Sequence, residues 1–193
     1  MQGIRTRNWA TVVYPESAPD KWKEILQDTH VTAFISPLHD ADVNPDGTPK
    51  KAHYHVLLAF DGPKTPEQAD RIFKKIGGVG REKVSSLRGY ARYLCHLDNP
   101  EKHQYDMAAV VLINGADYKS AISLPTDKYN AIREMIAYCS ANQIYSYADL
   151  LCYAAEHRED WFRVLCDSGT LVMTTYLKSL QWGLAQTQAN TRK

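Results

Sequence analysis

Two histidines separated by a single residue are the feature of this sequence best suited to chemistry. His53 and His55 flank Tyr54 within a largely apolar stretch. Such a stretch predicts a β-strand, and alternate side chains of a strand point to the same side. Both imidazoles would then share one surface, and imidazole is the commonest protein ligand for metal ions. The pattern indicates a metal site, although a histidine pair that only caps a sheet and solvates a loop has the same spacing.

A second group of candidate ligands lies upstream of the histidine pair. His39 and Asp42 follow another apolar segment, and the turn signal at 44–47 separates them from the pair. If the flanking strands form a hairpin, three imidazoles and a carboxylate come together and can hold a divalent ion. Such an ion acts as a Lewis acid on a phosphoryl oxygen. Asp40 and Asp46 are alternative sources of the carboxylate.

A tyrosine further along the chain is a candidate nucleophile. On a helix over 86–97, at ~100° per residue, Tyr90 falls within the apolar stripe and Tyr93 at its edge. Tyr90 is therefore expected to pack in the core, and Tyr93 to present its hydroxyl to a cleft. A phenol can attack a phosphodiester if a metal polarises the phosphate and a base or cation favours the phenolate. Taken alone, a tyrosine at a helix edge is usually structural, so its significance comes from its neighbours.

Positive charge is concentrated in one segment, although the chain as a whole has a net charge of +1. Between Arg71 and Arg92 the only acidic residue is Glu82. A segment of this kind is suited to binding phosphate groups. The candidates for contacts with a nucleic-acid backbone are Lys74, Lys75, Arg88 and Arg92. An ordinary solvated face has the same charge pattern.

Hydrophobic periodicity and turn residues predict an α+β domain. Strands are expected over 5–14, 31–36, 53–60 and 107–113, and helices over 19–27, 65–76 and 86–97. Hairpins and helices mixed in this order favour a mainly antiparallel sheet flanked by helices. The glycine-rich segment 77–80 is expected to end the second helix. It is not a phosphate-binding loop, because no Gly-Lys-Ser/Thr sequence follows it.

The sequence changes character after Pro125. Apolar residues at helical spacing predict an all-α region over 126–185. The 193 residues fit one large domain or two small ones, and we expect a first domain over 1–124 and a small helical domain over 125–193. No apolar run approaches the ~20 residues that span a bilayer, and the start has no signal-like core. We therefore expect a cytoplasmic protein with no membrane partner.

Taken together, several motifs resemble the plasmid rolling-circle replication initiators of the HUH endonuclease superfamily. They are Ile35-Ser36-Pro37-Leu38-His39-Asp40-Ala41-Asp42, Lys50-Lys51-Ala52-His53-Tyr54-His55-Val56-Leu57, Tyr93-Leu94-Cys95-His96 and, near the start, Tyr14-Pro15-Glu16-Ser17. HUH denotes two histidines around one bulky residue, here His53 and His55 around Tyr54. The match covers roughly residues 8–115. Each motif alone is unspecific, but their combination in this order is specific.

The resemblance implies a ferredoxin- or RRM-like fold for the first domain and assigns roles to its residues. The metal-binding positions, for Mn²⁺ or Mg²⁺, match His39, Asp42, His53 and His55. Tyr93 matches the catalytic tyrosine, because it opens the Tyr-Leu-x-His motif. Members of the family nick one strand at the double-strand origin of a plasmid. The tyrosine becomes linked to the 5′ phosphate, the freed 3′-OH primes leading-strand synthesis, and the strands are later transferred or rejoined.

The resemblance also implies partners. The substrate would be plasmid origin DNA, with double-stranded repeats and a single-stranded nick site. A host helicase and DNA polymerase are implied, because the chain has no Walker-type motif and no room for a helicase module. In related initiators a C-terminal helical domain assembles a ring, often a hexamer, so residues 125–193 are expected to form a homo-oligomer in the bacterial cytoplasm. The apolar stripes of this region also fit plain packing within one chain.

Two other functions fit the same residues. A metal-dependent phosphodiesterase or nuclease would use an activated water, and Tyr93 would then be structural. A non-catalytic repressor would keep the fold and bind the origin without cleaving it. Replacing Tyr93 by Phe separates the first two, because only a tyrosine nucleophile forms a covalent link to DNA.

Overall fold

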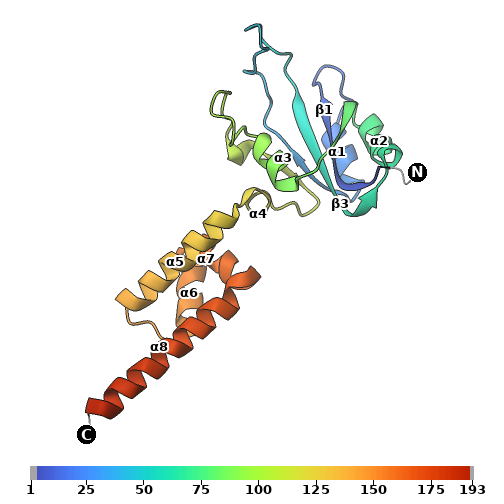
Figure 1. The fold of residues 1–193 in the computed structure, drawn as a ribbon. Helices are drawn as coiled ribbons and strands as arrows, with labels where there is room; N and C mark the ends of the chain where they lie inside the picture. The colour runs from blue at the N-terminus through green and yellow to red at the C-terminus, as the bar shows by residue number, and fades with distance from the viewer. Residues whose placement is uncertain (1–3, 192–193) are drawn as a thin grey trace. The chain divides into compact units, whose positions relative to one another are not determined.

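The computed structural model describes residues 4–191, which form two compact units (Figure 1). The first unit extends to Ser123 and contains a five-stranded sheet with flanking helices. The second begins at Leu124, and its regular elements are all helical. The α+β class predicted from the sequence is confirmed. Among the described residues, no helix combines the length and apolar character needed to cross a membrane.

Neighbouring strands of the sheet all run antiparallel, in the order β4-β1-β3-β2-β5. The strands are β1 (Thr6–Val13), β2 (Thr32–Ile35), β3 (Tyr54–Lys64), β4 (Gly78–Lys83) and β5 (Val111–Ile113). At the centre, β3 places His55 opposite Val12 of β1 and Val56 opposite Ile35 of β2. A slip of one residue would turn every side chain of β3 to the other face, so the register decides where the histidines point.

Helices cover both faces of this sheet. α1 (Trp22–Gln27) and α2 (Pro66–Lys75) lie on one face, and α3 (Leu87–Tyr93) and α4 (Tyr118–Ile122) on the other (Figure 1). The core under α1 and α2 includes Trp9, Val13, Leu26, Ile35, Val56, Leu58, Phe73 and Ile76. The core under α3 and α4 includes Ala10, Phe34, Leu57, Ala91, Leu94, Tyr105 and Tyr118. Alternate residues of β3 therefore serve two separate cores.

The strand β4 was not predicted from the sequence. Segment 77–80 was expected only to end a helix, but Gly78 begins a strand that pairs with β1 at the sheet edge. A Cβ atom at Gly78 would lie 2.8 Å from Thr11 Oγ1, closer than real Cβ contacts. Glycine is therefore needed here for the backbone of β4 to approach β1.

Two other elements have different bounds from those predicted. Ser86 caps α3 as expected, because its Oγ accepts a hydrogen bond from Gly89 N at 3.0 Å. However, α3 ends at Tyr93 instead of continuing to residue 97. The expected strand 107–113 is a 3₁₀ turn, η1 (Met107–Ala109), followed by the short β5. Tyr93 is therefore the last residue of α3 and not a residue in the middle of a longer helix.

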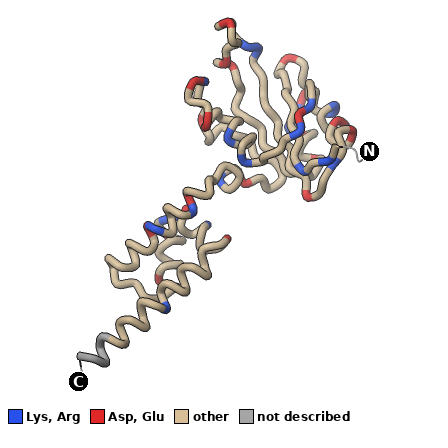
Figure 2. Tube along the Cα trace, viewed as in Figure 1, with Lys and Arg blue, Asp and Glu red and all other residues tan. Residues whose placement is uncertain are grey.

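The second unit packs its helices around a core of its own. They are α5 (Pro125–Ala141), α6 (Tyr147–His157), α7 (Glu159–Val164), the π-helical η2 (Leu165–Gly169) and α8 (Thr170–Thr191). The core includes Met135, Cys139, Leu150, Ala154, Trp161, Leu165, Met173 and Leu177. Along its 22 residues α8 has a single charged residue, Lys178, as the sparse colouring of Figure 2 shows. Leu171 and Trp182 on α8 are 78% and 68% exposed within this chain.

Candidate active site

The segment after β2 runs back alongside the start of β3. His39 and His53 form an antiparallel bridge, with N–H···O distances of 2.8 and 3.2 Å. One residue after β2 ends, Ser36 N donates to His55 O at 2.9 Å, and Ser36 Oγ accepts from His55 N at 2.9 Å. These hydrogen bonds hold His39 beside the His53–His55 pair, as the predicted hairpin requires.

A buried polar cluster occupies this end of the sheet. Its members His39, Asp42, His53, His55 and His96 are 0, 7, 8, 8 and 0% exposed. Potential ligand atoms lie within 4.8 Å of one another in two triads that share His39: one with His53 and His55, the other with Asp42 and His96. Four imidazoles and one carboxylate so close together form a donor set suited to a divalent transition ion.

The geometry separates Asp42 from the other two candidate carboxylates. Asp42 is buried, and its Oδ2 lies 3.4 Å from His39 Nδ1. Asp40 is exposed, and Asp46 accepts hydrogen bonds from the backbone and hydroxyl of Thr48 in an exposed turn. Of the three, Asp42 is the one positioned to share an ion with the histidines.

Hydrogen bonds to the backbone orient the imidazoles. His53 Nδ1 lies 2.8 Å from Lys51 O, and His39 Nε2 lies 3.0 Å from Leu94 O. Because a carbonyl oxygen can only accept, each of these nitrogens carries the hydrogen. In the neutral rings His53 Nε2 and His39 Nδ1 therefore bear lone pairs. Metal-bound histidines in proteins almost always donate their other N–H in this way.

The unpaired atoms of the cluster also fit a bound cation. His39 Nδ1 is buried and makes no hydrogen bond within residues 4–191, although it faces Asp42 Oδ2. A neutral His39 therefore directs a lone pair toward a carboxylate, and two acceptors repel each other unless a positive charge lies between them. A cation at this point would satisfy both groups, so the residues present fit a divalent ion.

Burial sets the protonation of the cluster. Burial, together with the nearby charges of His39 and His53, lowers the pKa of His55 to about 3. The pKa of His39 is also lowered, mainly by burial. Burial alone would raise the pKa of Asp42, but the Tyr105 hydroxyl and the imidazoles lower it below its usual range. His39 and His55 are thus held neutral and Asp42 ionised, which are the forms that bind metals.

The two tyrosines of α3 have different surroundings. The Tyr93 ring lies 5.2 Å from the rings of both His55 and His96, measured between centroids, and Lys102 Nζ lies 4.7 Å from its centroid. The Tyr90 hydroxyl lies 3.3 Å from His55 Nδ1, and burial, followed by the charge of Glu82, raises the pKa of Tyr90. Tyr90 packs against the core under α3, as expected, and its hydroxyl also contacts a candidate metal ligand.

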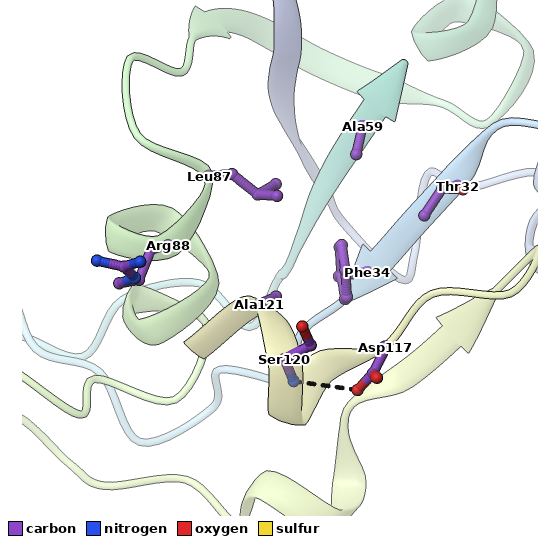
Figure 3. Close-up of a pocket in the computed structure, with 8 residues that line it drawn as sticks. All are labelled: Thr32, Phe34, Ala59, Leu87, Arg88, Asp117, Ser120 and Ala121. Atoms are coloured by element: carbon purple, nitrogen blue, oxygen red, sulfur yellow. Dashed lines mark hydrogen bonds between the residues drawn. The ribbon is translucent and has the colours of Figure 1, made fainter. Parts of the chain in front are cut away.

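The four predicted DNA-binding residues have different surroundings. Arg88 is exposed on α3 and lines a pocket with Phe34, Asp117 and Ser120; Figure 3 shows its guanidinium directed away from Phe34. By contrast, Arg92 donates to both carboxylate oxygens of Asp98 at 2.8 and 2.7 Å and to Ile122 O at 3.1 Å. The remaining two, Lys74 and Lys75, end α2, which covers the sheet face opposite α3. Arg88 is therefore the one that combines exposure with a place on the helix of Tyr93.

Sequence reasoning gave no role to two residues of the site. Tyr105 stacks on His39 with centroids 4.2 Å apart, and its hydroxyl donates to Asp42 Oδ1 at 3.0 Å. Burial raises the pKa of Tyr105 to about 12, which keeps this donor protonated. No sequence pattern pointed to Tyr105. His96 did belong to the Tyr93-Leu94-x-His96 motif. Only the structure, however, reveals that it lies beside His39 and Asp42 within the cluster.

Comparison with known proteins agrees with this architecture. Residues 1–119 match the family described as plasmid replication protein, origin binding domain, and residues 125–182 match the replication protein RepB, C-terminal family. Replication protein RepB of Lactiplantibacillus plantarum is 44% identical over 178 residues, covering 91% of this chain and 81% of that protein. A replication protein of Staphylococcus aureus is 36% identical, covering 91% and 89% of the two chains. The chain therefore belongs to the family of plasmid replication initiator proteins, with an origin-binding domain followed by a RepB-type C-terminal region.

Proposed function

We propose that this origin-binding protein starts plasmid replication by nicking one DNA strand through Tyr93. The observation that carries the proposal is the position of the Tyr93 ring, 5.2 Å from His55 at the border of a buried cluster of four histidines and one aspartate. A core built only for stability has little reason to bury five such groups, because each must be desolvated. Phosphodiester chemistry accounts for both the cluster and the tyrosine.

The proposed step exchanges one phosphodiester bond for another. Tyr93 Oη attacks the scissile phosphorus and loses its phenolic proton, while the 3′ oxygen of the preceding nucleotide leaves and gains a proton. The products are a 5′-phosphotyrosine link and a free 3′-OH. Because the new bond is again a phosphodiester, a later 3′-OH can attack it, rejoin the strand and release Tyr93. Lys102 places a positive charge beside the Tyr93 ring, and this charge would lie near the incoming phosphate.

His39, Asp42, His53 and His55 would hold one Mn²⁺ or Mg²⁺ ion, which supplies a Lewis acid for a non-bridging phosphoryl oxygen. Tyr105 fixes the Asp42 carboxylate through its hydroxyl. Lys51 O and Leu94 O fix the orientation of two imidazoles. These contacts prepare the donor atoms before any ion binds, which reduces reorganisation in the transition state.

The remaining parts of the protein would position DNA and assemble copies of the chain. Arg88 is suited to contact the phosphate backbone near Tyr93, whereas Lys74 and Lys75 could do so only if DNA reaches the α2 side of the sheet. The exposed apolar side chains of α8, including Leu171 and Trp182, would associate with other copies to form a homo-oligomer, such as a ring. A host helicase and polymerase would then act from the freed 3′-OH.

A nicking assay tests this function. Supercoiled plasmid with the cognate origin, and a single-stranded oligonucleotide spanning the nick site, are incubated with wild type, Tyr93→Phe or Tyr90→Phe in Mn²⁺ or EDTA. We expect a metal-dependent nick and a protein–DNA adduct that Tyr93→Phe abolishes. Tyr90→Phe is the matched control: it should still form the adduct, more slowly, because it loses only the hydroxyl that contacts His55.

The same assay separates the other two functions. Cleavage without an adduct, unchanged in Tyr93→Phe, would mean that a water molecule is the nucleophile. Specific binding without cleavage by any of the three proteins would mean that the chain is a non-catalytic origin-binding protein.

A further inference from the structure

His96 is a buried histidine for which the proposed nicking step has no use. It follows α3 by three residues and is 0% exposed. Its backbone φ is +58°, in the left-handed region that non-glycine residues rarely adopt. Such a conformation is retained only where the surrounding structure holds it, and it is concentrated at functional sites. Here it belongs to the turn that brings the imidazole back under α3.

The two ring nitrogens of His96 have different surroundings. Nδ1 lies 2.8 Å from His103 O and therefore carries the hydrogen, since a carbonyl can only accept. The neutral ring then has its lone pair on Nε2. That atom is buried and makes no hydrogen bond with any residue that the structure describes. A buried acceptor without a partner is unfavourable, so the site is incomplete as a purely structural arrangement.

The position of His96 shows what could complete it. A ring nitrogen of His96, a ring nitrogen of His39 and a carboxylate oxygen of Asp42 lie within 4.8 Å of one another. The His96 and His39 rings are 4.7 Å apart between centroids. His39 belongs to the same triad, and its Nδ1 is the other buried side-chain nitrogen without a hydrogen bond among the residues that the structure describes. His96 Nδ1 lies 3.9 Å from Asp42 Oδ1 and His39 Nδ1 lies 3.4 Å from Asp42 Oδ2, so both imidazoles lie beside the same carboxylate.

We propose that His96 is a fifth ligand of the metal centre, joining His39, Asp42, His53 and His55. The inference rests on the proposed function, because it needs an ion at that centre. It also couples the ion to the nucleophile: Tyr93 and His96 lie three residues apart, and Leu94 between them accepts the hydrogen bond from His39. A set of four imidazoles and one carboxylate favours Mn²⁺ over Mg²⁺, which prefers oxygen ligands and retains its water.

Titration with Mn²⁺ alone, without DNA, tests this role by calorimetry on the full chain. The variant is His96→Asn, because asparagine tolerates a positive φ better than alanine does. We expect His96→Asn to weaken Mn²⁺ binding at least tenfold, and His53→Ala to weaken it at least as much. His103→Ala is the matched control, since it keeps the carbonyl that orients His96 and should bind Mn²⁺ within twofold of wild type. Electron-spin-echo spectra of bound Mn²⁺ should show one fewer coupled imidazole in His96→Asn.

Each outcome has a distinct meaning. If His53→Ala loses affinity while His96→Asn keeps wild-type affinity and an unchanged spectrum, His96 is not a ligand, although the metal centre stands. If the wild type itself does not bind Mn²⁺, both the centre and the role of His96 are wrong. Circular dichroism and the unfolding midpoint of each apo protein identify a variant that has failed to fold. If His96→Asn fails to fold, the wild-type spectrum alone still decides. Four coupled imidazoles are expected if His96 is a ligand, and three if it is not.

Discussion

The two faces of the sheet are built from the same strands but differ in chemistry. Under α1 and α2, β3 contributes Val56 and Leu58 to an apolar core. Under α3, the same strand presents the buried His55 and, two residues later, Leu57. Because side chains alternate across a strand, one stretch of sequence provides both surfaces. The comparison indicates that one face anchors the strand while the other presents its imidazoles at a fixed spacing.

The two faces also differ in how completely their buried groups are satisfied. The face under α1 and α2 buries large apolar side chains such as Trp9 and Phe73. The face under α3 buries two imidazole nitrogens, on His39 and His96, that make no hydrogen bond among the described residues. The first arrangement is satisfied by packing alone, whereas the second would be completed by the cation of the proposed metal centre.

The largest expected effect is on folding stability, and it comes from the apolar face of the sheet under α1 and α2. Leu58→Ala should lower the free energy of unfolding by about 2–5 kcal/mol, because it leaves a cavity in a fully buried core. Urea unfolding measures this change. The Mn²⁺ affinity of the folded protein should stay within a few fold, since Leu58 points away from the histidines. A large loss of Mn²⁺ affinity in a correctly folded Leu58→Ala variant would contradict the view that one face provides packing and the other the metal site.

The next largest effect is on metal binding, and it comes from the face under α3 that carries the histidines. His53→Ala should weaken Mn²⁺ binding by about 100-fold, because it removes one lone pair from the donor set. Calorimetric titration measures it, with the exposed His157→Ala in the second unit as the control. The variant should keep most of its folding stability in EDTA. Unchanged affinity would mean that the cluster is structural and that the two faces differ only in polarity.

A smaller effect concerns pH. The pKa of His55 is about 3 in the folded protein, against about 6.5 in the unfolded chain, so only the unfolded state takes up a proton between these values. The stability of the metal-free protein should therefore be complete above pH 6.5 and fall as pH drops toward 3, by at most about 1.4 kcal/mol per pH unit for this group. Urea unfolding in EDTA at pH 5.0 to 6.5, where carboxylates contribute little, should show a shallower slope for His55→Gln. Equal slopes would argue against a neutral buried imidazole.

The smallest effect concerns DNA contacts on the two sides. Arg88→Ala should weaken origin binding only a few fold and reduce the salt dependence by about one counterion. Lys75→Ala, on the opposite side of the sheet, tests whether DNA extends there. Filter binding at several salt concentrations measures both. An effect of Lys75→Ala equal to that of Arg88→Ala would show that the bound DNA is not confined to the side of α3.

Much of this arrangement was predictable because it depends on local patterns. The alternation around His53 and His55 predicted their common face, and the turn signal before them predicted that His39 would return alongside. The strand β4 was missed because its sequence, Gly78-Val79-Gly80-Arg81-Glu82-Lys83, is polar and mostly exposed. An edge strand of this kind has no apolar alternation to detect.

The rest of the site depends on contacts between distant segments. Tyr105 lies 63 residues from Asp42 in the sequence, and no periodicity relates the two. The end of α3 at Tyr93 could not be inferred from the apolar spacing, which continues through Leu94 and Leu97. The left-handed turn at His96 is selected by tertiary packing, so the helix predicted through residue 97 does not reproduce it.

The most direct test of the central claim is to find which residue becomes linked to DNA. Wild type is trapped on an oligonucleotide spanning the nick site, digested with trypsin and analysed by mass spectrometry. The sequence suits this measurement, since cleavage after Arg88, Arg92 and Lys102 places Tyr90 and Tyr93 in different peptides, 89–92 and 93–102. We predict that the nucleotide mass lies on Tyr93 in peptide 93–102. A nucleotide on Tyr90 or elsewhere, or efficient cleavage with no linked peptide, would contradict the account.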